Sequence, residues 1–409
     1  MKPGTSVFSL LVVGLLARCA LAETTESDTH FAVAIRYWGG PTVTIETWFH
    51  PSFAYDATRE VLRAQPELRF SGSQPTRDTL AYDDELRQLY RQRQPAPPPR
   101  GPDKFARRLD WMQSEPHHAR STLGPEDAKQ TLIDGVNIIH WADLSPAEPG
   151  DPRGGDAPID VLMLPIDDPS PATIAAALKT VAALQPRFVL PVGAPDASVA
   201  EATTAIDAFL KLSKQQLAVV DVPHNTFAVR GGAARDAERS TVLHLAPTPW
   251  QPADELAGLL DRMDAACRNS QEVFVPLSVE QMNFRPANGT HTPRWNVEHM
   301  LGRQLGFFSQ IYAARQPDAF AHIDLNPAQM PADYQAAHSD WTGADEAHQM
   351  HRANAYVRRF AYLLDDLPLD ERAPDSFWTP RRLLAQMERH FNEHTANVVA
   401  KFELPDWPN

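Results

Sequence analysis

Cysteine is nearly absent from this chain of 409 residues, which has only Cys19 and Cys267. Cys19 falls in an N-terminal segment that we interpret as a secretory leader, so the mature protein keeps one cysteine and cannot form an intramolecular disulfide. Cys267 lies in the amphipathic stretch DELAGLLDRMDAACRNS. We therefore predict a packed, chemically inert thiol and not a catalytic one.

Positive charge is also scarce. Lys and Arg together number 38 against 52 Asp and Glu, which gives a formal net charge of −14. This balance argues against nonspecific binding to nucleic acid or to anionic membranes. The sequence has no basic run, no glycine-rich phosphate loop and no apolar run long enough to span a bilayer. The expected partner is a small-molecule substrate or a thiol, and a dimer is compatible with the sequence.

The N-terminus predicts export. Lys2 precedes an apolar run, Val7–Ala17, and the segment ends in Ala20, Leu21 and Ala22 before a polar stretch. This pattern is typical of a secretory signal peptide over residues 1–22, and we expect a secreted or periplasmic protein that begins at Glu23. Arg18 stands where a lipoprotein signal needs a small residue, so we expect cleavage and not lipid attachment at Cys19.

The remaining length predicts two domains, at 23–250 and 251–409, because it exceeds what one hydrophobic core usually supports. Of the 37 prolines, several lie in Gln94–Pro102, which we interpret as a stiff connector. The first domain alternates strands with helices and predicts an α/β sandwich. It opens with two β-rich runs around Gly39–Gly40, a hairpin signal. Further strands are predicted at Gly135–Trp141, Ile159–Pro165, Arg187–Val192, Leu217–Val222, Thr226–Arg230 and Ser240–Leu245, with a helix capped by Ser170.

The order of these elements resembles the metallo-β-lactamase fold, which implies an αββα sandwich. The histidine-rich motif with which that family binds zinc, H-x-H-x-D-H, does not occur in the sequence. Where the family has a histidine after the strand at Arg187–Val192, this chain has Gly193–Ala194–Pro195. We therefore predict an inactive first domain, a binding or structural module on a hydrolase scaffold.

Several polar residues of the first domain are not expected to bind a metal. Three carboxylates cluster near the strand Ile159–Pro165, and without histidine partners we expect them to be solvated loop charges: Asp160, Asp167 and Asp168. Adjacent histidines diverge on a strand or a helix, so a shared ion at His117 and His118 is not expected. His140 and His224 are read as ordinary polar positions.

The second domain predicts an all-α four-helix bundle. Apolar residues recur at helical spacing in four segments, Pro252–Glu272, Arg294–Arg315, Ala344–Leu367 and Pro380–Phe402. The long acidic connection Gln316–Gly343 is typical of bundles with one non-adjacent connection. In the third helix, His348 and His351 lie off the apolar stripe and are expected on the surface.

The last helix carries the most informative pattern of the chain. Thr379 is a candidate N-cap, with Pro380 at the first helical position. His390 and His394 are four residues apart and therefore lie on one side of the helix. That side also carries the apolar row expected to be buried: Leu383, Met387, Phe391, Val398 and Phe402.

A third histidine, His299, lies in the second helix, four residues after Trp295 and on the side of Gly302 and Gly306. Glycine in a helix costs about 1 kcal/mol relative to alanine, and a close helix approach beside His299 would explain both glycines. The pattern leaves two interpretations open, a shared metal ion or three ordinary core histidines.

Two motifs of the second domain resemble the DinB/YfiT-type metal-binding bundles. They are MNFRPANGTHTPRWNVEHMLG, from Met282 to Gly302, and RHFNEHTANV, which begins at Arg389. The resemblance implies a divalent metal ion, nickel or zinc, bound by His299, His390 and His394, with water in the remaining positions. Three protein ligands with open positions are typical of a catalytic metal.

Two functions follow as hypotheses. In the first, the protein is a metal-dependent enzyme, either a thiol transferase or a hydrolase, because the family that it resembles includes thiol-dependent S-transferases. Glu298 and Glu393 adjoin ligand histidines in sequence, but helical neighbours diverge by about 100°, so neither is assigned a catalytic role. In the second, the protein is a non-catalytic exported binding or scaffold protein with a structural or vestigial metal. Export favours the second, since small thiols are mostly cytosolic.

Overall fold

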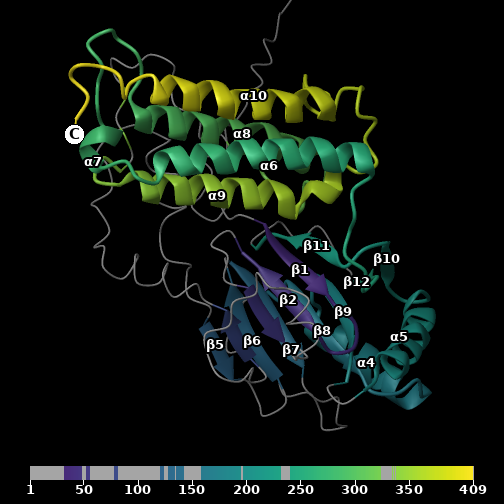
Figure 1. Ribbon diagram of the computed structural model, residues 1–409. Helices are drawn as coiled ribbons and strands as arrows, with labels where there is room; N and C mark the ends of the chain where they lie inside the picture. The colour runs from purple at the N-terminus through teal and green to yellow at the C-terminus, as the bar shows by residue number, and fades with distance from the viewer. Residues whose placement is uncertain are drawn as a thin grey trace, which may run out of the picture.

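A computed structural model describes residues 32–47, 52–55, 78–81, 120–123, 128–133, 135–141, 158–194, 197–231, 240–323, 334, 336 and 338–408. The predicted leader 1–22, the connector Gln94–Pro102 and the pair His117 and His118 lie outside the described residues. Figure 1 shows a helical bundle lying across the end of a two-sheet body. The coarse prediction of an α/β part followed by an all-α part is confirmed.

The α/β part contains two sheets. An antiparallel five-stranded sheet has the order β11-β1-β2-β3-β4. A mixed seven-stranded sheet has the order β10-β12-β9-β8-β7-β6-β5, in which the first five are parallel and the last two antiparallel. The strands are β1 Val33–Tyr37, β2 Val43–Glu46, β3 Ser52–Tyr55, β4 Asp78–Ala81, β5 Arg120–Leu123, β6 Ala128–Ile133, β7 Val136–Trp141, β8 Val161–Ile166, β9 Phe188–Gly193, β10 Ala218–Val222, β11 Thr226–Val229 and β12 Thr241–Leu245.

The predicted opening hairpin is confirmed. Strands β1 and β2 pair antiparallel, and Gly39 and Gly40 between them have φ angles of 93° and 57°. Glycine adopts these left-handed angles without steric cost, so the turn needs both residues. Thr42 closes the turn by donating its backbone N–H to the Gly39 carbonyl.

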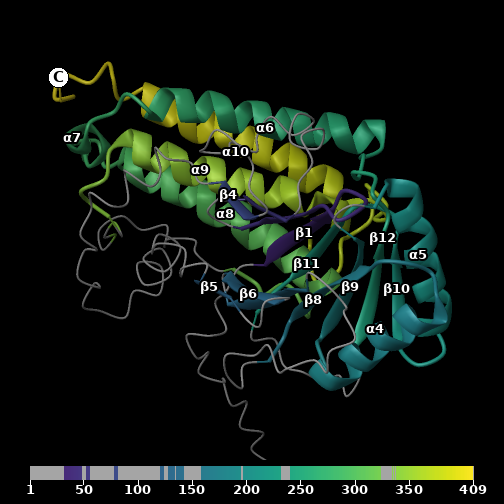
Figure 2. The same cartoon turned by 90° about the horizontal axis from the view of Figure 1, so that it is seen from below.

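Period-two alternation on β1 divides its side chains between two cores. Val33 and Ile35 pack in the core between the two sheets, whereas Ala32 and Ala34 belong to the core of the bundle. Helices α4 (Pro171–Leu184) and α5 (Val199–Ser213) pack against the seven-stranded sheet. In the described part of the chain, the bundle therefore packs on the outer face of the five-stranded sheet at β1 and β11 (Figure 2). The predicted αββα sandwich differs, because it would cover the outer face of this sheet with helices of the first domain.

The bundle has four long helices close to the predicted ranges: α6 Asp254–Phe274, α8 Pro293–Arg315, α9 Gly343–Arg359 and α10 Pro380–Val399. A short helix α7, Val279–Met282, follows α6, and a 3-10 turn, η2 Ala361–Leu364, follows α9. The Thr379 side chain caps α10 as predicted, by accepting from the Arg382 N–H. One prediction was wrong, because α10 ends before Phe402 and that side chain is 36 % exposed.

The helices run in an up-down-down-up order. α8 and α9 are parallel, since Arg294 pairs with Glu346 near their starts and the Tyr312 hydroxyl donates to the Val357 carbonyl near their ends. α10 runs antiparallel to α8, because His299 lies beside His390 whereas the later Phe307 lies beside the earlier Trp378. Parallel neighbours require a connection that returns along the bundle, as the predicted long crossover implied.

That connection travels back along α8. The Ile323 N–H donates to the Ser309 hydroxyl, 2.8 Å away, and the Tyr334 hydroxyl donates to the Glu298 carboxylate. Arg294, at the start of α8, donates to the Trp341 carbonyl. Gly306 also faces this connection: a Cβ placed there would lie 3.5 Å from the Ile323 carbonyl oxygen. The predicted close approach at Gly306 is therefore made by a loop and not by a helix.

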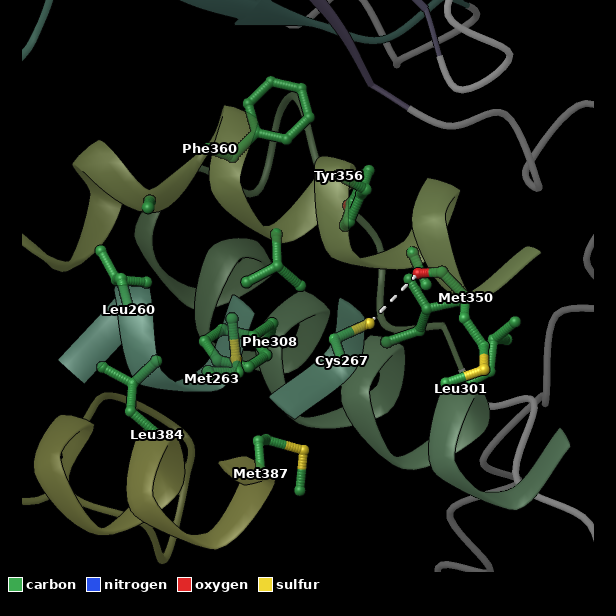
Figure 3. Packing of buried hydrophobic residues seen from close by; sticks show 14 of the residues in the cluster. Leu260, Met263, Cys267, Leu301, Phe308, Met350, Tyr356, Phe360, Leu384 and Met387 are labelled. Atoms are coloured by element: carbon green, nitrogen blue, oxygen red, sulfur yellow. Dashed lines mark hydrogen bonds between the residues drawn. The ribbon is translucent and has the colours of Figure 1, made fainter. Parts of the chain in front are cut away.

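Cys267 lies inside the bundle, as predicted. It is 0 % exposed, and its Sγ lies 3.9 Å from the Met350 carbonyl oxygen (Figure 3). Burial raises the pKa of the thiol to about 12. The thiolate is the reactive form, so this cysteine is inert at neutral pH.

An ionic contact joins the bundle to the sheet. Glu46 on β2 lies 2.8 Å from Arg36 on β1 and 3.0 Å from Arg359 at the end of α9. Arg359 is buried, and desolvation lowers its pKa while Glu46 opposes that shift. Nearby, the His224 ring packs against Tyr362 of η2 at 4.6 Å between centroids. The half-buried His224 thus belongs to the junction between the two parts.

The three carboxylates near β8 do not share one environment. Asp167 and Asp168 are exposed as predicted, and Asp168 accepts hydrogen bonds from the Ser170 N–H and the Thr173 hydroxyl, which lower its pKa. Asp160 is 6 % exposed and accepts from the Asn137 N–H at 2.9 Å. The prediction for Asp160 was wrong, because this carboxylate joins β7 to β8. Half-buried His140 lies on β7.

Among the described residues, no helix combines the length and apolar character needed to cross a membrane.

Candidate metal centre

The structure brings His299, His390 and His394 together. One ring nitrogen from each lies within 4.8 Å of the others, a spacing that could hold one metal ion. The ring centroids are 5.0 Å apart for His299 and His390, 4.9 Å for His299 and His394, and 4.4 Å for His390 and His394. Two ligands come from one face of α10 because four residues make about one helical turn, and α8 supplies the third.

The cluster is largely removed from solvent. His299 is 3 % exposed and His390 is 9 % exposed, whereas His394 is half-buried. Burial lowers the pKa of His390 to about 3 and that of His394 to about 4, with further lowering by neighbouring histidines. Both imidazoles are therefore neutral at pH 7, and a neutral imidazole keeps the lone pair that binds a metal.

Asn296 orients His394. Its side-chain NH₂ donates to the Thr292 carbonyl at 2.8 Å, so its Oδ1 faces His394 Nδ1, 2.7 Å away. An amide oxygen can only accept, which places the proton of His394 on Nδ1 and leaves Nε2 with the lone pair. Metal-binding histidines typically have such a partner on the second nitrogen. Periodicity in the sequence gave no sign of this role.

Trp295 stacks on the ring of His299. Their centroids are 4.5 Å apart with an interplanar angle of 10°, and Trp295 is 2 % exposed. The His291 ring also stacks on Trp295, at 3.5 Å between centroids. The stack on the buried Trp295 restricts the ring plane of His299, since close packing leaves little room for a large rotation.

The two glutamates beside the ligands lie outside the cluster. Glu298 is 3 % exposed and receives a hydrogen bond from Tyr334, which ties it to the α8–α9 connection. Glu393 is exposed on α10, 3.6 Å from Arg389. Neither belongs to the group of potential ligands.

The remaining histidines of α9 are separate from the centre. His351 is exposed, as predicted, but His348 is half-buried. Their ring centroids lie 6.3 Å apart. The surface assignment of His348 was therefore wrong.

A buried ion pair supports the start of α8, five residues before His299. Arg294 and Glu346 are 2.6 Å apart, with side chains 1 % and 5 % exposed. Arg294 also donates to the Trp341 carbonyl and to Asn283 Oδ1. Desolvation raises the pKa of Glu346 to about 7, and the charge of Arg294 opposes this rise. No pattern in the sequence predicts this pair, because charged residues on a helix usually face solvent.

The arrangement is three imidazoles on two helices, two of them with lowered pKa values and one of these with a fixed tautomer. Comparison of the chain with models of known families, with curated proteins and with solved structures gave no match. The candidate site therefore rests on the chain's own geometry.

Proposed function

We propose that this protein binds one divalent metal ion through His299, His390 and His394 and uses it on a small-molecule substrate, in a transferase or hydrolase reaction. The observation that carries the proposal is the convergence of three ring nitrogens within 4.8 Å. Asn296 supports the proposal further, because its contact with Nδ1 leaves the lone pair of His394 on Nε2.

The donor set fits nickel or zinc, since both accept neutral imidazole and a three-histidine set leaves further positions open. The up-down-down-up bundle and the two histidine motifs support a relation to the DinB/YfiT-type bundles. If this relation holds, the substrate would be a thiol or an electrophile that reacts with a thiol.

The ion, when bound, would lower the pKa of a thiol or a water molecule that it contacts. The chain's own residues supply the rest. Asn296 keeps the His394 proton on Nδ1, and the stack on Trp295 fixes the plane of His299. Burial of His299 and His390 excludes bulk water from two sides of the cluster and strengthens electrostatic interactions inside it.

In the described residues of the first domain, no matching set of ligands occurs. Among the residues that the structure describes, the bundle cluster is the one group of three or more potential metal ligands. At Gly193, where the resembled family has a histidine, a Cβ would lie 2.5 Å from the Ala202 Cβ. A side chain does not fit there without movement of α5, which supports an inactive sandwich.

A second candidate function is a non-catalytic exported protein with a structural metal. The low exposure of His299 and His390 favours it, because a structural site is closed to substrate. The half-buried His394 favours the catalytic alternative, since it gives the cluster an open side.

Metal analysis of the purified chain tests the proposal. We expect about one equivalent of nickel or zinc in the parent, and loss of tight binding in His299→Ala and His390→Ala, because each removes one of three ligands. His351→Ala, which removes an exposed histidine of the same bundle, should keep full stoichiometry. Mass spectrometry of the native protein gives the count.

Full stoichiometry in either ligand variant would refute the site. Cobalt substitution then separates the two functions. A change of the cobalt absorption spectrum on addition of a small thiol indicates an open position, whereas an unchanged spectrum indicates a closed structural ion.

A further inference from the structure

One side of α8 carries a row of side chains that extends beyond the metal cluster. Trp295, His299, Arg303 and Phe307 follow one another every four residues, and we call this row the α8 ladder. Residues four apart are neighbours on the surface of a helix. His299 is the member of the histidine cluster in the ladder, and Arg303 and Phe307 continue the ladder toward the C-terminal end of α8.

Arg303 is a cation without a carboxylate partner. Within the described ranges its guanidinium makes no hydrogen bond or ion pair, and it lies 5.6 Å from the Phe307 ring centroid. Several other arginines of the bundle do have such partners: Arg262 pairs with Glu388, and Arg381 pairs with Glu255 and Asp370. The positive charge of Arg303 is among the causes that lower the pKa of His390, so the guanidinium is close enough to interact with the cluster by charge.

Aromatic side chains surround the far end of the ladder. The Phe307 ring lies 6.1 Å from Phe377 and 5.6 Å from Trp378, measured between centroids. Phe377 is 64 % exposed, although it is large and apolar. The Trp378 indole Nε1 is buried and has no hydrogen-bond partner among the described residues. This end thus combines an exposed aromatic ring with a buried indole donor that no described residue uses.

We propose that Arg303, Phe307, Phe377 and Trp378 bind a small organic anion that carries an aromatic ring. The proposal rests on the proposed function, because it places the bound anion beside the metal ion. One helical turn separates Arg303 from His299, about 6 Å along the helix axis. A substrate of modest size therefore reaches both the cation and the metal centre.

The chemistry selects the ligand class. A guanidinium is a planar fork that matches a carboxylate and binds it more strongly than a neutral group. Aromatic rings prefer edge or offset contact with another ring, and Phe377 leaves its surface free for such contact. The chain carries a net charge of −14, so an unpaired half-buried cation marks a local preference for an anion.

Titration of the full chain with benzoate tests the proposal, with benzamide as the uncharged probe and acetate as the ringless one. Calorimetry or saturation-transfer NMR should show weaker binding of both controls than of benzoate. Arg303→Gln should weaken benzoate binding about tenfold or more, the scale of a lost charged hydrogen bond. Phe377→Ala should weaken benzoate and leave acetate unchanged.

Arg389→Gln is the matched control. Arg389 also lowers the pKa of His390, but its side chain is 63 % exposed on α10 and lies off the ladder. This variant should bind benzoate like the parent. If it weakens benzoate as much as Arg303→Gln does, general charge accounts for the effect and the proposal is overturned.

Nickel stoichiometry measured on the same samples keeps the two proposals apart. Reduced benzoate binding in Arg303→Gln with unchanged nickel supports the anion site. Equal benzoate binding in the parent and in Arg303→Gln, or no binding to the parent at millimolar probe, overturns it. A parent that binds neither nickel nor zinc overturns the proposed function alone, since binding that depends on Arg303 would still support the anion site.

Discussion

Asn296 is the residue that converts a group of histidines into a defined donor set. Its amide is held by the Thr292 carbonyl on one side and meets His394 Nδ1 on the other. Without this contact His394 could carry its proton on either ring nitrogen. A proton on Nε2 would remove the lone pair with which that nitrogen can bind a metal ion. Asn296 is therefore a positioning residue that acts through His394.

Replacement of Asn296 tests this role. We expect Asn296→Ala to lower metal affinity about 10- to 100-fold, the usual effect of removing the partner of a ligating histidine. Competition with a metal chelator gives the affinity. Asn392→Ala, at an exposed position of α10, should have no effect. An unchanged affinity in Asn296→Ala would show that His394 needs no orienting partner.

At this scale the sequence predicted the histidines but not their neighbours. His390 and His394 follow from helical spacing, and the resemblance pointed to His299. Asn296 and Arg303 follow from neither, because one polar residue on a helix carries no periodic signal. Their roles depend on which atoms of α10 and of the aromatic cluster lie opposite, and only tertiary packing determines that.

The element that organises the centre is α8. It supplies His299, Asn296 and Trp295, and its first turn is held to α9 by Arg294 and Glu346. A buried charge without its partner is costly, so the pair fixes the position of the first turn of α8 relative to α9. The position of His299 along the bundle depends on where α8 begins.

The buried pair of Arg294 and Glu346 should make a large contribution to the free energy of unfolding. We expect Arg294→Met to lower the free energy of unfolding by about 3–5 kcal/mol, because Glu346 is left buried and unpaired. The double variant Arg294→Met/Glu346→Leu should lose less than Arg294→Met alone. Urea unfolding at fixed metal concentration gives both values.

Arg262→Met supplies the comparison. Its pair with Glu388 is exposed, with side chains 55 % and 33 % accessible, so the loss should stay within about 1 kcal/mol. Similar losses for Arg294→Met and Arg262→Met would contradict a structural role for the buried pair.

Helix starts were predictable, whereas the ends of α9 and α10 were not. Thr379 and Pro380 mark the first turn of α10 as the capping rules require. The apolar pattern of α9 continues to Leu367, but the helix ends at Arg359. Beyond it, the 3-10 turn brings Tyr362 against His224 of the other part of the molecule. Packing across the junction overrides the local periodicity.

The whole molecule is joined by Glu46, which accepts from Arg36 within the sheet and from Arg359 of the bundle. The two cores meet on β1, whose alternate residues enter one or the other. His224 sits at the same junction, beside Tyr362. Movement of the bundle relative to the sheets would expose the Glu46 ion pairs, the alanines of the shared core and the His224–Tyr362 contact to solvent.

His224 should make the junction sensitive to acid. Desolvation lowers its pKa below the ordinary 6.5, Arg36 lowers it further, and Asp365 opposes them. The unfolded chain therefore takes up a proton near pH 6.5 that the folded chain resists. Stability contributed by neutral His224 is complete above pH 6.5 and is lost as the pH falls below it.

We expect the stability advantage of the parent over His224→Gln to shrink between pH 7.5 and pH 5. Urea unfolding of both proteins at each pH measures this difference, and the other histidines cancel in the comparison. A pH-independent difference would mean that His224 titrates alike in the folded and unfolded chains.

The division of the chain into an α/β part and an all-α part was predictable from length and pattern. The way in which the two parts pack against each other was not. Ala32, Ala34 and Ala228 look like ordinary alternating strand residues, and nothing in their spacing says that a bundle covers them. Small side chains allow this close approach, yet alanine is common in every class of structure. The predicted outer helical layer came from the resemblance, and in the described residues the bundle takes its place.

The shared strand β1 limits how this protein can be cut into pieces. A fragment that stops before Asp254 would leave the alanines of the five-stranded sheet bare and Glu46 without Arg359. The bundle alone would expose Arg359, Tyr362 and the apolar residues around them. Poor solubility of either fragment would then reflect a lost neighbour, so biochemical work on each half should begin from the intact chain.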